Sequence, residues 1–179
     1  MTTSIVYTPN FLDIVSNTSV VIDTCVIIDA LKITCLDTFL RELLKHGCTF
    51  LSAPPVKNEF LTAANTDQKY NELNEYLKSL QLVFLPLDIE HRLNNEGKIF
   101  NIALRKSKVN NPSFVDRLIL SIPFLYRTSP EKIYIMTSNH KDVPKDFYDR
   151  VGFISIDNNE KFIEIGLYEF NEKKFNKIV

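Results

Sequence analysis

Side chains with oxygen ligands stand where the chain leaves a predicted strand or enters a predicted helix. Asp23 ends one apolar run, and Asn139 and Asp142 follow another. Glu59 and Asp116 lie in the first turns of predicted helices. Carboxylate and amide oxygens are the ligands that Mg²⁺ and Mn²⁺ prefer. Such ions activate water and stabilise the transition state of phosphoryl transfer, so these five residues are the candidates for metal-assisted catalysis.

Short apolar runs that alternate with helical patterns must position these residues. The predicted strands cover residues 19–23, 48–54, 82–88, 132–138 and 151–157. The predicted helices cover residues 26–46, 54–64, 67–80, 88–106 and 114–127, with Asp88 and Ser113 as caps. Strands that alternate with helices indicate a parallel sheet covered on both faces. We therefore predict an α/β fold, a three-layer α/β/α sandwich with a central, mainly parallel five-stranded sheet.

Length and composition indicate one soluble domain over residues 1–179. A chain of 179 residues fits one domain of ordinary size, and no segment is long or flexible enough to divide it. The predicted core covers about residues 19–157, which leaves short terminal extensions at 1–18 and 158–179. We expect some helix at 11–15, and an extra strand or hairpin arm at 161–170.

The charge balance and the cysteines limit the class of protein. A net charge of −1 gives no overall attraction for nucleic acid, so local cations must attract a polyanionic substrate. The three cysteines are odd in number and form no CxxC pair, which argues against a disulfide scaffold or a zinc knuckle. No apolar run approaches the ~20 residues that span a bilayer, and the N-terminus lacks a basic region. We expect a cytoplasmic protein without a membrane partner.

Each candidate also has a purely structural interpretation. Asp23 suits a helix cap, and Glu59 and Asp116 complement helix dipoles. Asn139 suits a turn, and Asp142 suits a solvated loop. Taken together these interpretations weaken, because ligands of a parallel sheet gather beyond the carboxyl ends of its strands. Carboxylates that meet there repel one another unless protons or cations neutralise them.

Four segments in order resemble the motifs of PIN-domain nucleases, a family that includes the VapC-type toxins. They are VVIDTCVIIDAL, SAPPVKNEFLTA, PSFVDRLILSI and IYIMTSNHKDVP, and they span most of the chain, about residues 19–157. The resemblance implies a PIN-like fold and a divalent-metal-dependent endoribonuclease that cuts RNA with Mg²⁺ or Mn²⁺. For toxin members it also implies a partner antitoxin, and a homodimer is an assembly that this interpretation leaves open.

The resemblance also assigns roles to residues of this chain. Asp23, Glu59 and Asp116 would be the principal acidic ligands, Asn139 would take the fourth position, and Asp142 would support it directly or through water. Thr24 and Thr137 would orient carboxylates through their hydroxyl groups. A water of lowered pKa would attack the phosphorus in line and leave a 5′-phosphate and a 3′-hydroxyl. Three cations beside the motifs are candidates for flanking phosphates, or else ordinary surface charges: Lys57, Arg117 and Lys141.

The sequence departs from the family pattern at two positions and leaves other functions open. Cys25 stands where an Asn is usual, and Val143 where an aromatic often follows the last Asp. A catalytically silent PIN-like module that binds RNA or protein is the main alternative, and a flap-type DNA nuclease is a third. A haloacid-dehalogenase-like phosphatase would need a second Asp at position 25. The histidines show no zinc spacing, and His140 is interpreted as a loop residue.

Overall fold

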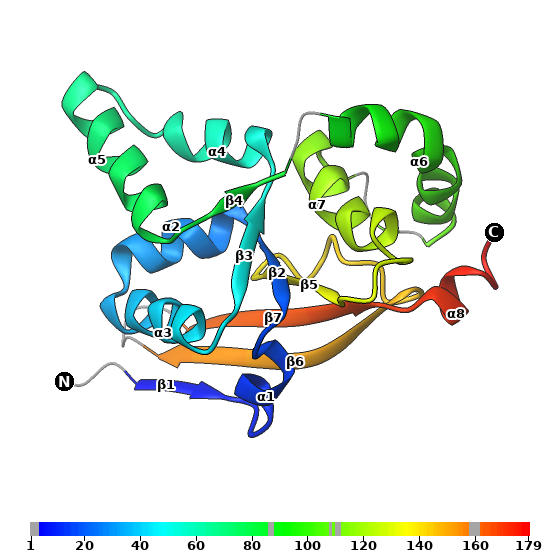
Figure 1. The fold of residues 1–179 in the computed structure, drawn as a ribbon, viewed down its shortest axis with the longest axis horizontal. Coiled ribbons are helices and arrows are strands. Elements are labelled where there is room, and N and C mark those ends of the chain that lie inside the picture. Colours follow the sequence, from blue (N-terminus) through cyan, green and yellow to red (C-terminus); the bar gives the residue numbers. More distant parts are fainter. Residues whose placement is uncertain (1–3, 86–87, 108, 110–111, 158–161) are drawn as a thin grey trace.

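A single mixed sheet forms the centre of the protein (Figure 1). The computed structural model describes residues 4–85, 88–107, 109, 112–157 and 162–179, without the side chains of 88–96. The strands are β1 (Ser4–Tyr7), β2 (Ser19–Ile22), β3 (Thr49–Ser52), β4 (Val83–Phe84), β5 (Ile133–Thr137), β6 (Tyr148–Asp157) and β7 (Phe162–Phe170). Their order is β1-β6-β7-β5-β2-β3-β4. The α/β class agrees with the prediction, but the prediction of a five-stranded, mainly parallel sheet is wrong.

The parallel part of the sheet comprises β5, β2, β3 and β4. Their sequences are short apolar runs, as expected of strands that are covered on both faces. β4 is shorter than predicted, and residues 86–87 of the predicted strand lie outside the described residues. In the register between β2 and β5, Ile22 lies opposite Met136. Asp23 and Thr137 therefore leave the sheet side by side.

The antiparallel part is built from the segments that were predicted to be terminal extensions, together with β6. β7 lies between β5 and β6 and is antiparallel to both, and β1 pairs with β6 at the edge. The run 151–157 was predicted as the fifth strand of the parallel set, but β7 separates it from that set. The alternating pattern of residues 161–170 predicted a strand without showing which neighbour it joins. β6 and β7 adjoin in sequence, which favours hairpin pairing.

The helices mostly begin and end where the sequence predicted. They are α1 (Phe11–Val15), α2 (Thr24–Lys32), α3 (Thr34–Lys45), α4 (Pro54–Leu61), α5 (Asp67–Ser79), α6 (Asp88–Lys106), α7 (Phe114–Leu125) and α8 (Glu172–Phe175). The predicted helix 26–46 is two helices, because Ile33 is extended, with φ −121° and ψ 99°. Ile33 and Thr34 are both β-branched, which lowers helix propensity at this point. α7 begins at a Ser113 cap, as predicted.

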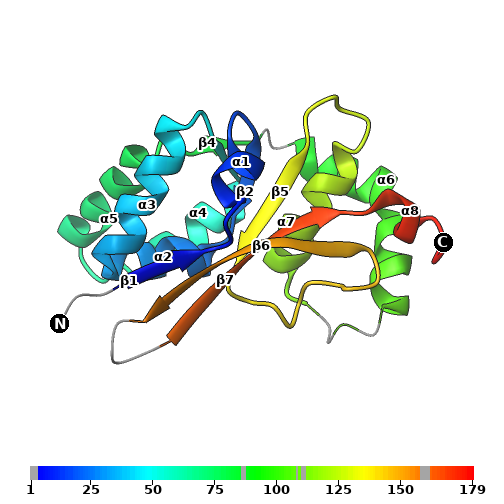
Figure 2. The same ribbon diagram turned by 90° about the horizontal axis from the view of Figure 1, so that it is seen from below.

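Helices cover both faces of the sheet (Figure 2). α2 to α5 lie on one side, and α6 and α7 lie on the other. α1 joins the first group, since the rings of Phe11 and Phe39 are 5.8 Å apart, and α8 joins the second through the contact of Phe175 with Phe124 at 5.0 Å. In the part of the chain that the structure describes, no helix has both the length and the apolar character needed to cross a bilayer.

Candidate metal site

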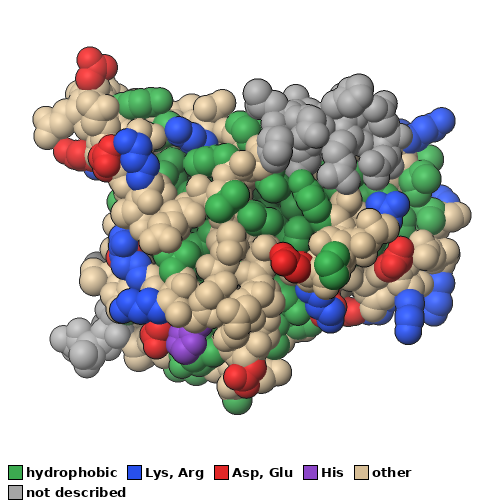
Figure 3. Space-filling view, viewed as in Figure 1, with side chains coloured by type: hydrophobic (Ala, Val, Ile, Leu, Met, Phe, Trp, Pro, Cys, Tyr) green, Lys and Arg blue, Asp and Glu red, His purple; other side chains and the backbone are tan. Residues whose placement is uncertain are grey.

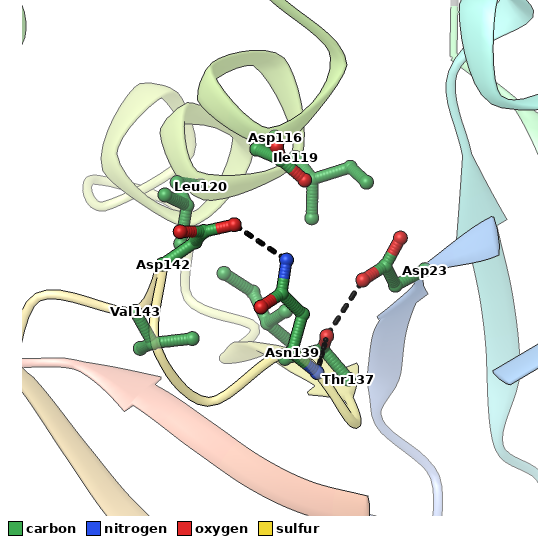
Figure 4. Close-up of a pocket in the computed structure, with 9 residues that line it drawn as sticks. Asp23, Asp116, Ile119, Leu120, Thr137, Asn139, Asp142 and Val143 are labelled. Carbon is green, nitrogen blue, oxygen red and sulfur yellow. Dashed lines mark hydrogen bonds between the residues drawn. The ribbon is translucent and has the colours of Figure 1, made fainter. Parts of the chain in front are cut away.

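A small cavity lies at the carboxyl ends of β2 and β5, beside the start of α7 (Figure 4). Its polar lining consists of Asp23, Asp116, Thr137, Asn139 and Asp142. Its apolar wall consists of Ile119, Leu120, Ile135 and Val143, which the sequence had not singled out as site residues. The volume is about 10 Å³, which is close to the space that one water molecule needs. Four of the five predicted site residues therefore share a space the size of one water or small ion.

Asp23 is the most deeply buried of these carboxylates, with 8% of its surface exposed. It holds the N-cap position of α2, yet its side chain makes no capping hydrogen bond. Its Oδ2 accepts the hydroxyl of Thr137 at 2.6 Å and the thiol of Cys25 at 3.1 Å. The helix-cap interpretation of Asp23 therefore does not account for where its carboxylate points.

The surroundings of Asp23 raise the pKa of its carboxyl group. Burial raises the pKa of Asp23 above its ordinary value of 3.8, the bonds from Thr137 and Cys25 lower it, and the negative charge of Asp116 raises it further. The repulsion by Asp116 places the two carboxylates within electrostatic reach of each other. An ionised pair here would gain from a cation between its members.

Asp116 is held by the first turn of α7. Its Oδ2 accepts the backbone N–H of Ser113 at 3.0 Å, and its own N–H donates to Oγ of Ser113 at 3.1 Å. This reciprocal pair is a capping box, which fixes the carboxylate without a metal. Asp116 therefore has a structural role in the capping box of α7, and it also lines the cavity.

Asn139 and Asp142 lie in the loop after β5 and bind each other. Nδ2 of Asn139 donates to Oδ2 of Asp142 at 2.5 Å, and the backbone N–H of Asn139 donates to Oγ1 of Thr137 at 2.9 Å. Because Nδ2 donates to Asp142 and the bond to Thr137 comes from the backbone, the side-chain carbonyl oxygen of Asn139 remains a further acceptor. The loop thus offers two kinds of oxygen ligand for a cation, the amide oxygen of Asn139 and the carboxylate of Asp142.

Glu59 does not line the cavity but lies beside it. It is exposed on α4, and its Oε2 accepts the hydroxyl of Thr24 at 2.5 Å. Thr24 directly follows Asp23, so the two carboxylates belong to neighbouring positions of one edge. The structure therefore gathers Asp23, Asp116, Asn139 and Asp142 in one cavity, and attaches Glu59 to it through Thr24.

Two hydrogen bonds of His140, which the sequence did not predict, attach the loop after β5 to the sheet. Nδ1 of His140 bonds to the hydroxyl of Tyr168 at 2.7 Å, and Nε2 bonds to the backbone oxygen of Glu164 at 3.0 Å. Both partners lie on β7, so His140 attaches the loop of Asn139 and Asp142 to the sheet. Only the position of His140 next to Asn139 could have suggested this role.

The cations that were predicted to contact phosphates differ in their surroundings. Nζ of Lys57 lies 5.5 Å from the centre of the Phe84 ring, and Nε of Arg117 bonds to the backbone oxygen of Ser113 at 3.5 Å. Lys141 is exposed. Of the three, Arg117 is next in sequence to a residue that lines the cavity.

The oxygen atoms that line the cavity suit a hard cation in kind, although the described side chains do not form a complete coordination sphere. Among the described residues, no three His, Cys, Asp or Glu side chains lie close enough together to hold a metal ion. Unshielded carboxylates repel one another and take other partners, as Asp116 does with Ser113 and Asp142 does with Asn139. Oxygen donors around a space for one small ion match Mg²⁺ and Mn²⁺ in kind.

Comparisons of this chain with protein-family models, with curated proteins and with solved structures found no match.

Proposed function

We propose that this chain is a PIN-like endoribonuclease of the cytoplasm that depends on Mg²⁺ or Mn²⁺. One observation carries the proposal: the buried carboxylate of Asp23 and the carboxylate of Asp116, from distant parts of the chain, line one cavity with Asn139 and Asp142. A protein gains no stability from burying a carboxylate beside another one. Such an arrangement is a common sign of a functional site.

The residues of the cavity have separable tasks in the proposed reaction. Asp23, Asp116 and Asp142 would hold the cation, with the side-chain oxygen of Asn139 as a neutral ligand. A bound Mg²⁺ or Mn²⁺ supplies charge neutralisation for a phosphodiester and lowers the pKa of a water molecule. Thr137 fixes the direction of the Asp23 carboxylate through its hydrogen bond.

The surroundings of the cavity support the same chemistry. Ile119, Leu120, Ile135 and Val143 form its apolar wall, and exclusion of water by that wall strengthens electrostatic interactions inside. Glu59, held by Thr24 at the margin, would join the ligands or bind a second ion.

A second candidate is a catalytically silent module that binds RNA or a protein partner, an antitoxin included. Two contacts favour it: the carboxylate of Asp116 serves the capping box of α7, and that of Asp142 accepts from Asn139. Cys25 donates to Asp23 where the family pattern has an Asn. In this alternative the polar groups satisfy one another and no ion is needed.

Metal uptake and product chemistry together separate the two candidates. Calorimetry with Mn²⁺ should detect binding to the wild-type protein, and Asp23→Asn should abolish it. Cleavage of single-stranded RNA should need Mn²⁺ or Mg²⁺ and leave 5′-phosphate ends, which mass spectrometry identifies. A metal-independent contaminating ribonuclease leaves 2′,3′-cyclic phosphates instead.

Matched variants keep this test sharp. Asp116→Asn should lower cleavage by at least ~100-fold while α7 keeps an amide acceptor for its capping box. Asp67→Asn removes the same charge from the exposed first turn of α5 and should leave metal binding and cleavage unchanged. RNA binding that ignores metal, without cleavage in any sample, would establish the silent module.

A further inference from the structure

Two arginines line one cavity between α6 and α7, next to the candidate metal site. Arg105, near the end of α6, and Arg117, in the first turns of α7, border a space of about 320 Å³ together with Asn101 and Leu104. Arg117 directly follows Asp116 in the sequence, and Asp116 lines the candidate metal site. This arginine cavity is therefore adjacent to the place where a phosphodiester would react.

Within the described residues, neither Arg105 nor Arg117 forms an ion pair with a carboxylate. The other arginines whose side chains are described are paired with carboxylates: Arg41 with Asp37 at 2.8 Å, Arg127 with Glu172 at 3.9 Å and Arg150 with Glu164 at 2.9 Å. Guanidinium groups match phosphate geometry in a bidentate way, so two unpaired ones on a single cavity favour a phosphate ligand.

A lysine cavity continues the same surface toward the C-terminal segment. Lys106, the residue after Arg105, borders a space of about 440 Å³ with Lys174, Lys177 and Asp146, and Lys174 is itself paired with Asp149. Nζ of Lys106 donates to the backbone oxygen of Ile178 at 2.7 Å, which joins the end of α6 to the segment after α8. The two cavities therefore border consecutive residues of α6, Arg105 and Lys106.

The charge of this surface differs from that of the whole chain. The two cavities together present Arg105, Lys106, Arg117, Lys174 and Lys177, although the protein has a net charge of −1. Figure 3 shows lysine and arginine side chains exposed at the end of the molecule that carries α6 and α8, and others at the opposite end. A local excess of positive side chains on a protein of slightly negative net charge is typical of a surface that binds a polyanion.

We propose that these two cavities form a basic track that binds the backbone of single-stranded RNA beside the scissile bond. The proposal rests on the nuclease function proposed above, and it names the surface that holds the substrate. The strand would pass from the metal site over Arg117 and Arg105 and then over Lys106 to Lys177. Contacts with phosphates carry no sequence information, so the track supplies affinity and position rather than specificity.

Binding without cleavage tests the track. Asp23→Asn protein in EDTA is the parent, and a fluorescent single-stranded RNA of mixed sequence is the probe in anisotropy titrations. Arg105→Gln with Arg117→Gln forms one double variant, and Lys106→Gln with Lys177→Gln forms the other. Each should weaken the Kd by on the order of 10-fold at low salt, and should reduce the slope of log Kd against log salt by about 1.4 between about 50 and 200 mM NaCl.

The control removes the same charge from the far end of the molecule. Lys69→Gln with Lys78→Gln changes two lysines of α5 that pair with Glu72 and Glu75, and α5 lies opposite α6 and α8 in Figure 1. This variant should change the Kd by less than about 2-fold, since salt screens distant charges. Circular dichroism melting curves check that all variants fold.

Several outcomes would overturn the track. They are an undetectable affinity of the parent for RNA, equal losses in the track and control variants, and competition by polyglutamate as strong as by RNA, which would indicate an acidic protein partner. The result is independent of the nuclease test. Loss of RNA binding in track variants of a protein that never cuts RNA would refute only the nuclease, whereas unchanged binding in a protein that does cut would refute only the track.

Discussion

The hydroxyl of Thr137 donates to Oδ2 of Asp23 at 2.6 Å and accepts the backbone N–H of Asn139 at 2.9 Å. One side chain thus joins the end of β2, the end of β5 and the loop that follows β5. The parallel register, in which Ile22 lies opposite Met136, brings the two strand ends together. Thr137 therefore couples the stability of the sheet edge to the geometry of the candidate site.

Replacing Thr137 by Val should destabilise the protein. Val keeps the shape of the side chain but removes its donor and its acceptor, so the buried carboxylate of Asp23 and the N–H of Asn139 lose a partner. A hydrogen bond to a charged group contributes roughly 1.5–3 kcal/mol, and the free energy of unfolding should fall by about that amount in urea titrations. Thr38→Val is the control, because the exposed hydroxyl of Thr38 bonds only within α3. Equal effects of the two variants would contradict this account.

Replacing Asp23 by Asn should stabilise the protein at neutral pH. Burial raises the pKa of Asp23 above 3.8, so folding stabilises the protonated acid relative to the carboxylate more than the unfolded chain does. The stabilisation from this group is complete below the unfolded pKa and is lost as the pH rises through the folded pKa. At neutral pH the ionised carboxylate therefore lowers the free energy of unfolding. The Asn variant has no charge at this position and should be more stable.

Denaturant titrations across the acidic and neutral range, with metal chelated, measure this effect. The variant should be the more stable protein at neutral pH, and its advantage should shrink as the pH falls toward 3.8. Asp67→Asn, in the exposed first turn of α5, should bring no gain at any pH. A wild-type protein that stays more stable than Asp23→Asn at neutral pH would show that the Asp23 carboxylate has a stabilising partner.

Sequence patterns predicted the parallel half of the sheet better than the antiparallel half. The apolar runs ending at Asp23 and Thr137 are strands, because short runs covered on both faces leave few alternatives. The residues of β1, at the start of the chain, carry little apolar alternation, and pairing with β6 rather than local propensity makes them a strand. The local sequence pattern of a segment does not show which distant strand it will pair with.

The sequence could predict which residues lie near the candidate site, but it could not predict which atoms of those residues contact one another. Strand-end logic identified Asp23, Asn139 and Asp142, which line the cavity in the structure. It gave Glu59 the same status, although the bond to Thr24 holds that carboxylate at the margin. Hydrogen bonds decide such differences, and they depend on rotamers and register that residue types alone do not specify.

The three cysteines should differ in reactivity toward iodoacetamide. Burial raises the pKa of the Cys25 thiol to about 11 and that of Cys48 to about 12. At pH 8 only about one Cys25 side chain in 1,000 is then a thiolate, which is the reactive form. Cys35, partly buried on α3, should be alkylated first, and mass spectrometry of timed digests measures the order. In urea all three should react at similar rates, and rapid labelling of Cys25 in the folded protein would contradict its buried setting.

Replacing Phe175 by Ala should cost far more stability than replacing Phe162, although both lie in the segment that the sequence indicated as an extension. Phe175 is 2% exposed, and its ring packs against Phe124 at 5.0 Å and Phe170 at 5.3 Å. Phe162, at the start of β7, is 65% exposed. A buried Phe→Ala change costs about 3–5 kcal/mol, because it removes apolar contacts and leaves a cavity. An exposed one costs roughly 0.5 kcal/mol or less, so urea titrations should separate the two variants clearly. Equal, small losses would mean that α8 does not close the core over α6 and α7, and that the lysines of the proposed track are not held in place by the fold.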